Sequence, residues 1–244
     1  MSEHPPVIVI EDLRKTFGDV HAVAGLDLRV PAGELFCFLG PNGAGKTTTI
    51  KMLCGLLKPG SGRIVIRGMD LHEHAQEVKK ITGYIPDQPY LYERLTAAEF
   101  YEFTGDLYGI PRDEIRAKRE KAFELFGLED YQDSLIKNMS HGIRQRLCYA
   151  SVFLHDPAVL FIDEPFIGLD PYSIRLIKNL LREKCAAGAT IFLTTHILAL
   201  AEDMADRIGI IDNGRLVALG TLHELMRQTD MQGRLEDVFL KLTE

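Results

Sequence analysis

One glycine-rich segment, Gly40–Thr47, constrains the fold of this chain more than any other stretch of its sequence. The segment reads GPNGAGKT and fits the pattern G-x-x-x-x-G-K-[ST]. An apolar run, Glu34–Leu39, precedes it and predicts a buried strand, while a helix is predicted from about Lys46 to Leu57. Because the motif stands between a strand and a helix, it predicts a P-loop, whose backbone N–H groups surround phosphates.

Several residues of this loop have side chains suited to a nucleoside triphosphate and its metal ion. Lys46 can reach the β- and γ-phosphates, and the hydroxyl of Thr47 can bind Mg²⁺. The N-terminus of the following helix adds partial positive charge beside the phosphates. The predicted nucleotide contacts in this segment are Gly40, Pro41, Asn42, Gly43, Ala44, Gly45, Lys46, Thr47 and Thr48. The sequence therefore predicts that ATP and Mg²⁺ bind here.

A second apolar run, Val159–Ile162, is followed by two acidic residues, Asp163 and Glu164. Ligands of parallel sheets bind beyond the carboxyl ends of the strands, so we expect both carboxylates to lie beside the P-loop. Asp163 is then placed to hold Mg²⁺, and Glu164 to polarise the water that attacks the γ-phosphate. Together the two motifs predict a P-loop nucleoside triphosphatase.

The order of predicted elements indicates an α/β fold with a mixed sheet. Two β-rich stretches, Val7–Leu13 and Ala22–Val30, predict an N-terminal antiparallel β-subdomain. About 60 residues from Thr96 onward have a helical pattern that interrupts the alternation of strands and helices, which predicts an inserted α-helical subdomain. Within a single domain of residues 1–244, we expect the core in 1–95 and 156–219, the helical subdomain in 96–155 and a C-terminal helical tail in 220–244.

Composition excludes other classes of protein. The net charge is −7 and the chain shows no basic stripe, so no nucleic-acid partner is expected. A membrane-spanning helix needs roughly 20 consecutive apolar residues, and the sequence has no such run. The polar segment Met1–Pro6 lacks the apolar core of a signal peptide, so secretion is not expected.

Further motifs resemble one family of P-loop proteins. The segment Met139–Arg146, MSHGIRQR, resembles the L-S-G-G-Q signature of ATP-binding cassette (ABC) transporter nucleotide-binding domains. Gly168-Leu169-Asp170 resembles the D-loop of that family, and His196 resembles its switch histidine. Order and spacing match along nearly the whole chain. The chain is therefore identified as a member of this family, in which it resembles the ATPase subunit.

The resemblance implies a head-to-tail dimer of two identical or two different cassettes. Each ATP then lies between the P-loop of one cassette and the signature helix of the other. The site residues that rest on the resemblance are Phe17 for stacking on adenine, Ser140, Gly142 and Asp170 for the nucleotide, and His196 for catalysis beside Lys46 and Glu164. A transmembrane permease subunit and a peripheral location on the cytoplasmic face of the cell membrane are also implied.

The sequence departs from the family pattern at three positions. His141 stands where Gly is usual, and Ile143 stands where Gln is usual. Asp87 occupies the Q-loop position of a Gln, with Gln88 one residue later. We expect Asp87 to contact Mg²⁺ or a water while adding negative charge, and His141 to crowd a phosphate held by the partner cassette.

The segment Tyr84–Tyr108 and the C-terminal Leu235–Leu242 resemble bacterial exporters whose cassette and membrane subunits are separate chains. Five of the eight tyrosines, Tyr84, Tyr90, Tyr92, Tyr101 and Tyr108, lie in the first of these segments. We expect residues Pro89–Phe103 to dock a short cytoplasmic helix of the membrane subunit, chiefly through Tyr90 and Tyr92 in a predicted loop. Phe100, Phe103 and Tyr108 are instead expected to form the core of the helical subdomain.

Two other functions stay open at this point. The first is a soluble cassette ATPase of the iron–sulfur cluster assembly type. The second is a regulatory cassette that binds ATP with weak turnover. Glu164 and His196 argue against the second alternative, whereas His141 and Asp87 leave it open.

Overall fold

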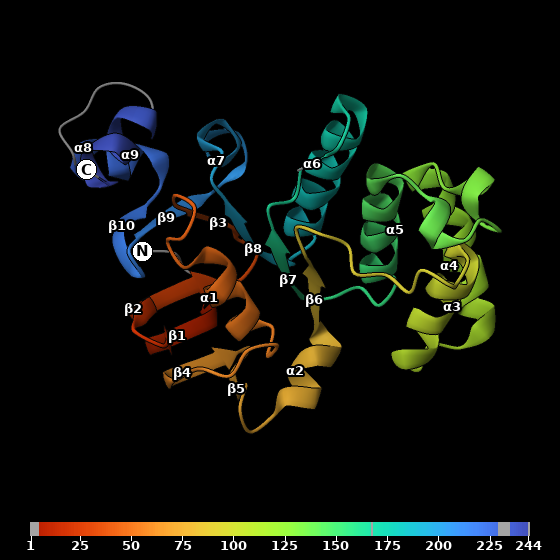
Figure 1. Ribbon diagram of the computed structural model, residues 1–244, viewed down its shortest axis with the longest axis horizontal. Helices are drawn as coiled ribbons and strands as arrows, with labels where there is room; N and C mark the ends of the chain where they lie inside the picture. The colour runs from red at the N-terminus through yellow and green to blue at the C-terminus, as the bar shows by residue number, and fades with distance from the viewer. Residues whose placement is uncertain (1–4, 167, 229–234, 244) are drawn as a thin grey trace.

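The structure is a computed structural model that describes residues 5–166, 168–228 and 235–243. Figure 1 shows two sheets with helices between and around them, and a separate group of helices at the right-hand side. The strands are β1 Pro6–Phe17, β2 Val20–Pro31, β3 Leu35–Leu39, β4 Ser61–Ile66, β5 Met69–Asp70, β6 Thr82–Ile85, β7 Val159–Asp163, β8 Thr190–Thr195, β9 Arg207–Asp212 and β10 Arg215–Gly220. The helices are α1 Lys46–Leu53, α2 Ala75–Ile81, α3 Ala97–Leu107, α4 Arg112–Phe126, α5 His141–Phe153, α6 Pro171–Ala186, α7 Leu198–Met204, α8 Leu222–Gln228 and α9 Leu235–Thr243, with short 3-10 turns at Glu129–Tyr131 and Ile136–Asn138.

The larger sheet has the strand order β10-β9-β3-β8-β7-β6. All neighbours in it are parallel except β9 and β10, which form an antiparallel hairpin. Asn213 and Gly214, at the tip of that hairpin, have φ angles of 47° and 74°, as a two-residue type I′ turn requires. The sheet is therefore mixed, as the sequence predicted.

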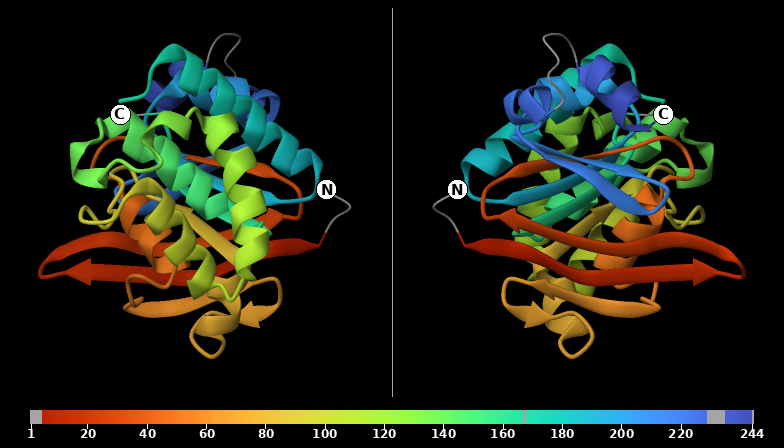
Figure 2. Two further views of the ribbon diagram at one scale, coloured as in Figure 1. Left: turned by 90° about the vertical axis from the view of Figure 1, so that its right-hand side faces the viewer. Right: turned by 90° about the vertical axis from the view of Figure 1, so that its left-hand side faces the viewer.

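The smaller sheet is antiparallel, with the order β2-β1-β4-β5. Its long β1–β2 ribbon crosses the lower half of both views in Figure 2. This sheet is the predicted N-terminal antiparallel β-subdomain, and helix α1 packs against both it and strands β7 and β8 of the larger sheet. The P-loop helix is thus held from two sides.

The side chains of β3 explain how the core is divided. Phe36 and Phe38 point toward α1 and the antiparallel sheet, where their rings pack 5.3 and 5.4 Å from the ring of Phe192. Leu35, Cys37 and Leu39 point to the opposite face, which the remaining helices cover. A strand buried on both faces reads as a continuous apolar run, which is why this strand could be predicted from sequence.

Helices α3, α4 and α5 pack together and lie in the chain between β6 and β7, which are neighbouring parallel strands. The first of them begins with a capping box. The Glu99 N–H donates to Thr96 Oγ1 over 3.2 Å, and the Thr96 N–H donates to Glu99 Oε2 over 2.8 Å. The predicted fold class is confirmed. The proposed limits of the core, the helical subdomain and the tail stay predictions.

Several local predictions were wrong. Helix α1 ends at Leu53, four residues early, because Gly55 has φ 66° and its N–H bonds the carbonyl of Met52, while the Leu56 N–H bonds the carbonyl of Lys51. This is a Schellman motif, which satisfies the last carbonyls of a helix. Strand β1 continues to Phe17, and the short strand β5 was not predicted.

The inward face of α3 also differs from the prediction. Its buried residues are Ala97, Tyr101 and Gly105, one turn apart, and the Tyr101 ring packs edge-on against Phe123. Phe103 and Tyr108 were predicted to be core residues but are 36% and 38% exposed. Gly105 sets the face, because a Cβ there would lie 2.4 Å from Ile115 Cδ1.

None of the helices in the described residues combines the length and the apolar character that crossing a membrane requires.

Candidate active site

The P-loop runs from the carboxyl end of β3 to the N-terminus of α1 and is packed tightly against neighbouring backbone. The Gly40 N–H donates to the carbonyl of Thr195, at the end of the adjacent strand β8, over 3.3 Å. Gly45 has φ 106°, and a Cβ there would lie 2.3 Å from the carbonyl oxygen of Ala22. Only glycine tolerates both the backbone angle and the contact, so this position fixes the loop against β2.

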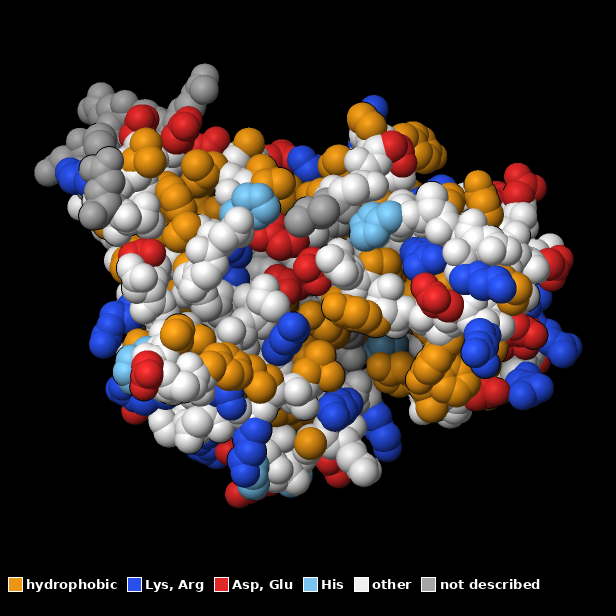
Figure 3. All heavy atoms as spheres, in the orientation of Figure 1, with side chains coloured by type: hydrophobic (Ala, Val, Ile, Leu, Met, Phe, Trp, Pro, Cys, Tyr) orange, Lys and Arg blue, Asp and Glu red, His pale blue; other side chains and the backbone are white. Residues whose placement is uncertain are grey.

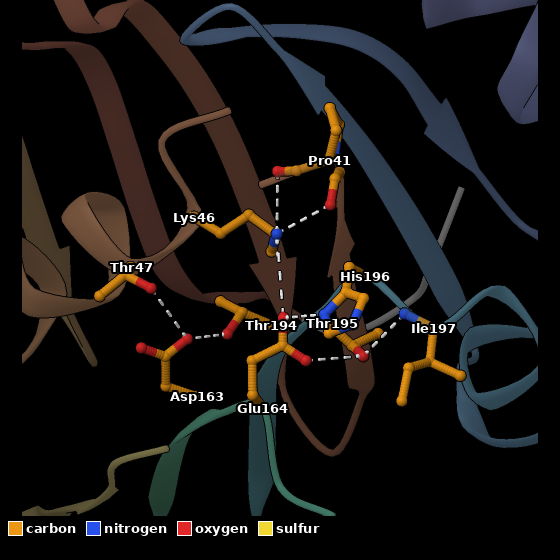
Figure 4. Close-up of polar contacts among 10 residues, drawn as sticks. Pro41, Lys46, Thr47, Asp163, Glu164, Thr194, Thr195, His196 and Ile197 are labelled. Carbon is orange, nitrogen blue, oxygen red and sulfur yellow. Dashed lines mark hydrogen bonds and ion pairs between the residues drawn. The ribbon is translucent and has the colours of Figure 1, made fainter. Parts of the chain in front are cut away.

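Lys46 lies inside the curve of this loop, as Figure 4 shows. Its Nζ donates to the carbonyls of Gly40 and Pro41 over 2.7 and 3.0 Å, and it lies 3.8 Å from Glu164 Oε1. The side chain is only 6% exposed. Burial lowers the pKa of Lys46, while the nearby carboxylates of Glu164 and Asp163 act in the opposite direction. A phosphate oxygen could replace the two carbonyls as the acceptor for this ammonium group.

Asp163, at the carboxyl end of β7, lies completely buried beside the P-loop helix. Its Oδ1 accepts hydrogen bonds from the hydroxyls of Thr47, over 3.4 Å, and Thr194. Its Oδ2 has no hydrogen-bond partner in the part of the chain that the structure describes. Burial raises the pKa of Asp163. A buried carboxylate oxygen without a donor, next to the Thr47 hydroxyl, is a set of oxygen ligands that fits Mg²⁺.

Glu164 is the next residue, and its carboxylate is held by two groups from the end of β8 and the turn after it. Oε1 lies 2.8 Å from His196 Nδ1, and Oε2 accepts from the Thr195 hydroxyl over 3.1 Å. Glu164 also has a φ of 48°, which is uncommon for a residue with a side chain and occurs often at functional sites. The contacts fix a carboxylate beside Lys46, where a general base for water would lie (Figure 4).

The two threonines that hold these acids were not predicted. Thr194 and Thr195 end β8, the strand that pairs with β7, so the rule that placed Asp163 and Glu164 also applies to them. Each hydroxyl orients one carboxylate, and the Thr195 hydroxyl also accepts from the Ile197 N–H over 3.0 Å. Two consecutive threonines directly after an apolar run were the signal in the sequence that could have identified them.

Asp87 lies in a hollow between the loop after β6 and the start of α5, with His141 and Arg144 on its other side. Its Oδ1 accepts from the Gln88 N–H over 2.8 Å. Within the described residues, no hydrogen bond joins Asp87 to Thr47 or Asp163, although its charge adds to burial in raising the pKa of Asp163. Its proposed role toward the metal stays a prediction.

The signature segment begins helix α5. The Ser140 hydroxyl caps the helix by accepting from the Ile143 N–H over 3.4 Å. The imidazole of His141 faces Gly168, where a Cβ would lie 2.6 Å from His141 Cδ2. Gly142 follows in the same turn, and Ile143 is buried in the core. Of the two signature departures, only His141 therefore lies at the surface.

Asp170 and Phe17, which were also predicted to contact the nucleotide, lie outside the contacts of Figure 4. Asp170 caps α6, where its Oδ1 accepts from the Ser173 N–H over 3.0 Å and its Oδ2 from the Ser173 hydroxyl over 2.6 Å. These bonds lower the pKa of Asp170. Phe17 ends β1 at the tip of the β1–β2 ribbon, is 49% exposed, and has Lys15 Nζ 5.3 Å above its ring. Their contacts with a nucleotide stay predictions.

Comparison with known proteins agrees with this geometry. A family model described as "ABC transporter" matches residues 23–167. The chain is 39% identical to the Nod factor export ATP-binding protein I of Ralstonia nicotianae, over 91% of this chain and 69% of that protein. It is also 39% identical to the daunorubicin/doxorubicin resistance ATP-binding protein DrrA of Streptomyces peucetius, over 92% and 71% of the two chains.

A solved structure gives the same result for the fold. The structure described as that of an ATP-binding subunit of an ABC transporter superposes with a TM-score of 0.92 and 35% identity, over 98% of this chain and 100% of that one. The P-loop, the paired acids of β7 and His196 lie together in this fold. The chain therefore belongs to the ABC transporter family, as one of its ATP-binding and ATP-hydrolysing subunits.

Proposed function

We propose that Glu164 activates the hydrolytic water, while Lys46, Thr47 and Asp163 hold MgATP. The observation that supports this assignment is the continuous set of contacts from Thr47 and Asp163 to Glu164, Lys46 and His196. Mg²⁺ held by Thr47 and Asp163 would neutralise charge on the β- and γ-phosphates. His196 and Thr195 orient the Glu164 carboxylate, and Lys46 compensates negative charge beside it.

We further propose that the chain powers export through a separate transmembrane subunit and works at the cytoplasmic face of the membrane. The names of its relatives, for Nod factor export and for drug resistance, support export. They favour this function over a soluble ATPase of the iron–sulfur assembly type. The ATPase rate of the purified chain distinguishes an exporter subunit from a regulatory cassette, because the regulatory cassette would bind ATP but hydrolyse it slowly.

The proposed docking surface for that subunit is the loop that carries Tyr90 and Tyr92. These side chains are 83% and 60% exposed, and the Tyr92 ring packs edge-on against Phe103 at 5.4 Å. Large aromatic side chains exposed in a loop are typical anchors of protein interfaces. Phe103, half-exposed beside them, belongs to the same surface.

Backbone contacts connect this loop to the signature helix. Within the loop, the Glu93 carbonyl accepts from the Lys137 N–H over 3.1 Å, and the Glu93 carboxylate pairs with Arg144 over 3.2 Å. Arg144 lies in the first turns of α5 and also donates to the carbonyls of Ile136 and Met139, which precede Ser140. A shift of the docking loop would therefore displace Ser140 and His141. A shift of these two residues would likewise displace the docking loop.

Replacing both Tyr90 and Tyr92 with Ser tests the docking proposal. Loss of two aromatic anchors should lower the amount of membrane subunit that co-purifies with the chain about tenfold. Binding of ATP, measured by titration of the isolated chain, should stay near the wild-type value. Leu125→Ser, which changes a half-exposed apolar residue of α4 outside the loop, is the matched control. Normal assembly and transport by the double variant would place the docking surface elsewhere.

We also propose that a second cassette, identical or different, completes the site through Ser140 and Gly142. In that arrangement the exposed His141 lies where backbone must approach a phosphate closely, and its side chain hinders the approach. The gap around Gly168 is already filled by the His141 ring, so the side chain has little room to move that way.

Replacing His141 with Gly should raise the ATPase rate of the purified chain. Relief of about 1 kcal/mol of crowding corresponds to a roughly fivefold faster rate. His141→Ala keeps a Cβ and should give a smaller gain, which separates close backbone approach from loss of the imidazole. Steady-state phosphate release at saturating MgATP measures both variants. An unchanged or lower rate in His141→Gly would show that Ser140 and Gly142 suffice with His141 present.

A further inference from the structure

The loop that follows β7 turns sharply at Glu164. The φ angle of 48° is unfavourable for a residue with a side chain, and such an angle persists only where the surrounding structure holds it. Thr195 and His196 contact the carboxylate of Glu164, so they hold its side chain. The backbone is held by other groups. On the side of the sheet, the Glu164 N–H donates to the carbonyl of Thr194 over 3.1 Å.

Pro165, the next residue, limits how the other side of this turn can be held. Proline has no N–H, so its carbonyl is the only hydrogen-bonding group of its backbone. The hydroxyl of Tyr149 donates to that carbonyl over 3.3 Å. Among the described residues, no second hydrogen-bond donor reaches the same carbonyl. The turn at Glu164 is therefore held by strand β8 on one side and by Tyr149 on the other.

Tyr149 lies in the middle of α5, and its surroundings fix the position of its hydroxyl. The side chain is completely buried, and its ring packs against Phe126 and Phe153 at centroid distances of 6.4 and 6.1 Å. Burial raises the pKa of Tyr149 well above its ordinary value, so the hydroxyl keeps its proton and can donate. A ring packed on both sides has little freedom to move, so the hydroxyl is a fixed donor for the Pro165 carbonyl.

This hydrogen bond lies beneath the surface that a nucleotide would reach. Acidic side chains gather near the centre of the face shown in Figure 3, with a histidine on either side of them. The side chain of Glu164 is 11% exposed, whereas Tyr149 is 0% exposed. Tyr149 is therefore out of reach of ATP and of the attacking water. Any effect of Tyr149 on hydrolysis must pass through the backbone of Pro165 and Glu164.

We propose that Tyr149 is a positioning residue for ATP hydrolysis, which holds Glu164 in place through its hydrogen bond to the Pro165 carbonyl. A general base must lie within hydrogen-bond reach of the water that it activates. Without this bond the turn at Glu164 can relax, and the carboxylate then spends less time in the productive position. The inference rests on the proposed function, because it assumes that Glu164 is the general base.

A purely structural role for the same bond predicts a different result. A buried tyrosine hydroxyl usually finds a hydrogen-bond partner, whether or not the partner has a function. In that case, loss of the hydroxyl would lower the stability of the chain but would leave the kinetics of the folded protein unchanged. Positioning predicts instead that kcat falls while the affinity for MgATP stays the same, because Lys46, Thr47 and Asp163 are untouched.

Tyr149→Phe removes the hydroxyl and keeps the ring that packs in the core. The kcat of the purified full chain should fall about three- to tenfold, the effect of one hydrogen bond between uncharged groups. KM for MgATP should stay near the wild-type value, and phosphate release over a range of MgATP concentrations measures both constants. Tyr101→Phe is the matched control, because Tyr101 is also almost completely buried but belongs to α3, away from the loop after β7. It should keep wild-type kcat, and thermal unfolding compares the stability of the two variants.

A double variant tests whether Tyr149 acts through Glu164. In the Glu164→Gln background, the side chain at position 164 can no longer accept a proton, so its exact position matters little. Adding Tyr149→Phe to Glu164→Gln should therefore leave the residual rate unchanged, whereas two independent effects would multiply. Single-turnover hydrolysis of radiolabelled ATP resolves these slow rates.

The outcomes separate this inference from the proposed function. Wild-type kcat in Tyr149→Phe overturns the inference, as does an equal loss of kcat in Tyr101→Phe. A loss of MgATP affinity without a loss of kcat also overturns it, and so does the same fold loss in the Glu164→Gln background. In all these cases the proposed function stands if Glu164→Gln itself is slow. If Glu164→Gln hydrolyses ATP at the wild-type rate, or if the wild-type chain hydrolyses none, the proposed function and the inference both fail.

Discussion

Replacing Glu164 with Gln should lower the ATPase rate about 100-fold or more, which is the range expected for loss of a positioned general base. The amide keeps the shape of the side chain and can still contact His196 and Thr195, whose groups lie 2.8 and 3.1 Å from the carboxylate. What it loses is the ability to accept a proton from water. Because Lys46, Thr47 and Asp163 are unchanged, affinity for MgATP should stay near the wild-type value.

Two measurements check this result together. Phosphate release at saturating MgATP reports turnover, and titration with a fluorescent ATP analogue reports binding. Glu183→Gln changes an exposed glutamate on α6 and is the control for the substitution itself. Slow hydrolysis in Glu164→Gln should also prolong the ATP-bound pair of cassettes, which size-exclusion chromatography with MgATP would detect. Wild-type turnover in this variant would show that another group activates the water.

The parts of this fold that could be predicted from sequence are those with a local cause. Strand β7 could be predicted because its apolar run, Val159–Ile162, is followed by two acidic residues. The P-loop could be located because its glycines and Lys46 follow from the geometry of phosphate binding. The capping box at Thr96 marks the start of α3 through side chains three residues apart.

The parts that could not be predicted depend on contacts distant in sequence. Phe103 and Tyr108 have a spacing compatible with an inward helix face, yet the close approach of Ile115 to Gly105 turns Tyr101 inward instead.

The same distinction applies to the candidate site. The acids of β7 and the lysine of the P-loop meet as predicted, because strand order in a parallel sheet places them at one edge. The contact of His141 with Gly168 depends on the path of a loop that the motifs do not specify. Contacts of Phe17, Asp87 and Asp170 with nucleotide or metal require the ligand itself, so they stay predictions.

Removing the Lys46 side chain tests whether this residue holds MgATP. Lys46→Ala should weaken MgATP binding about 30-fold or more, since truncating one member of a buried charge pair costs about 2–5 kcal/mol. Lys46 lies 3.8 Å from Glu164 Oε1 and is only 6% exposed, so its loss leaves Glu164 and Asp163 as uncompensated negative charge beside the phosphates. Lys51→Ala, at an exposed lysine in the last turn of the same helix, should bind normally.

Comparing Glu164→Gln with Lys46→Ala tests which residue is needed for hydrolysis and which for binding of MgATP. Glu164→Gln is expected to bind and not turn over, whereas Lys46→Ala is expected to fail at binding, so its turnover is lost as a consequence. Lys46→Met adds a check, because it keeps most of the length of the side chain without the charge and should resemble Lys46→Ala. Near wild-type affinity in both Lys46 variants would mean that the backbone N–H groups of the loop and the N-terminus of α1 hold the phosphates by themselves.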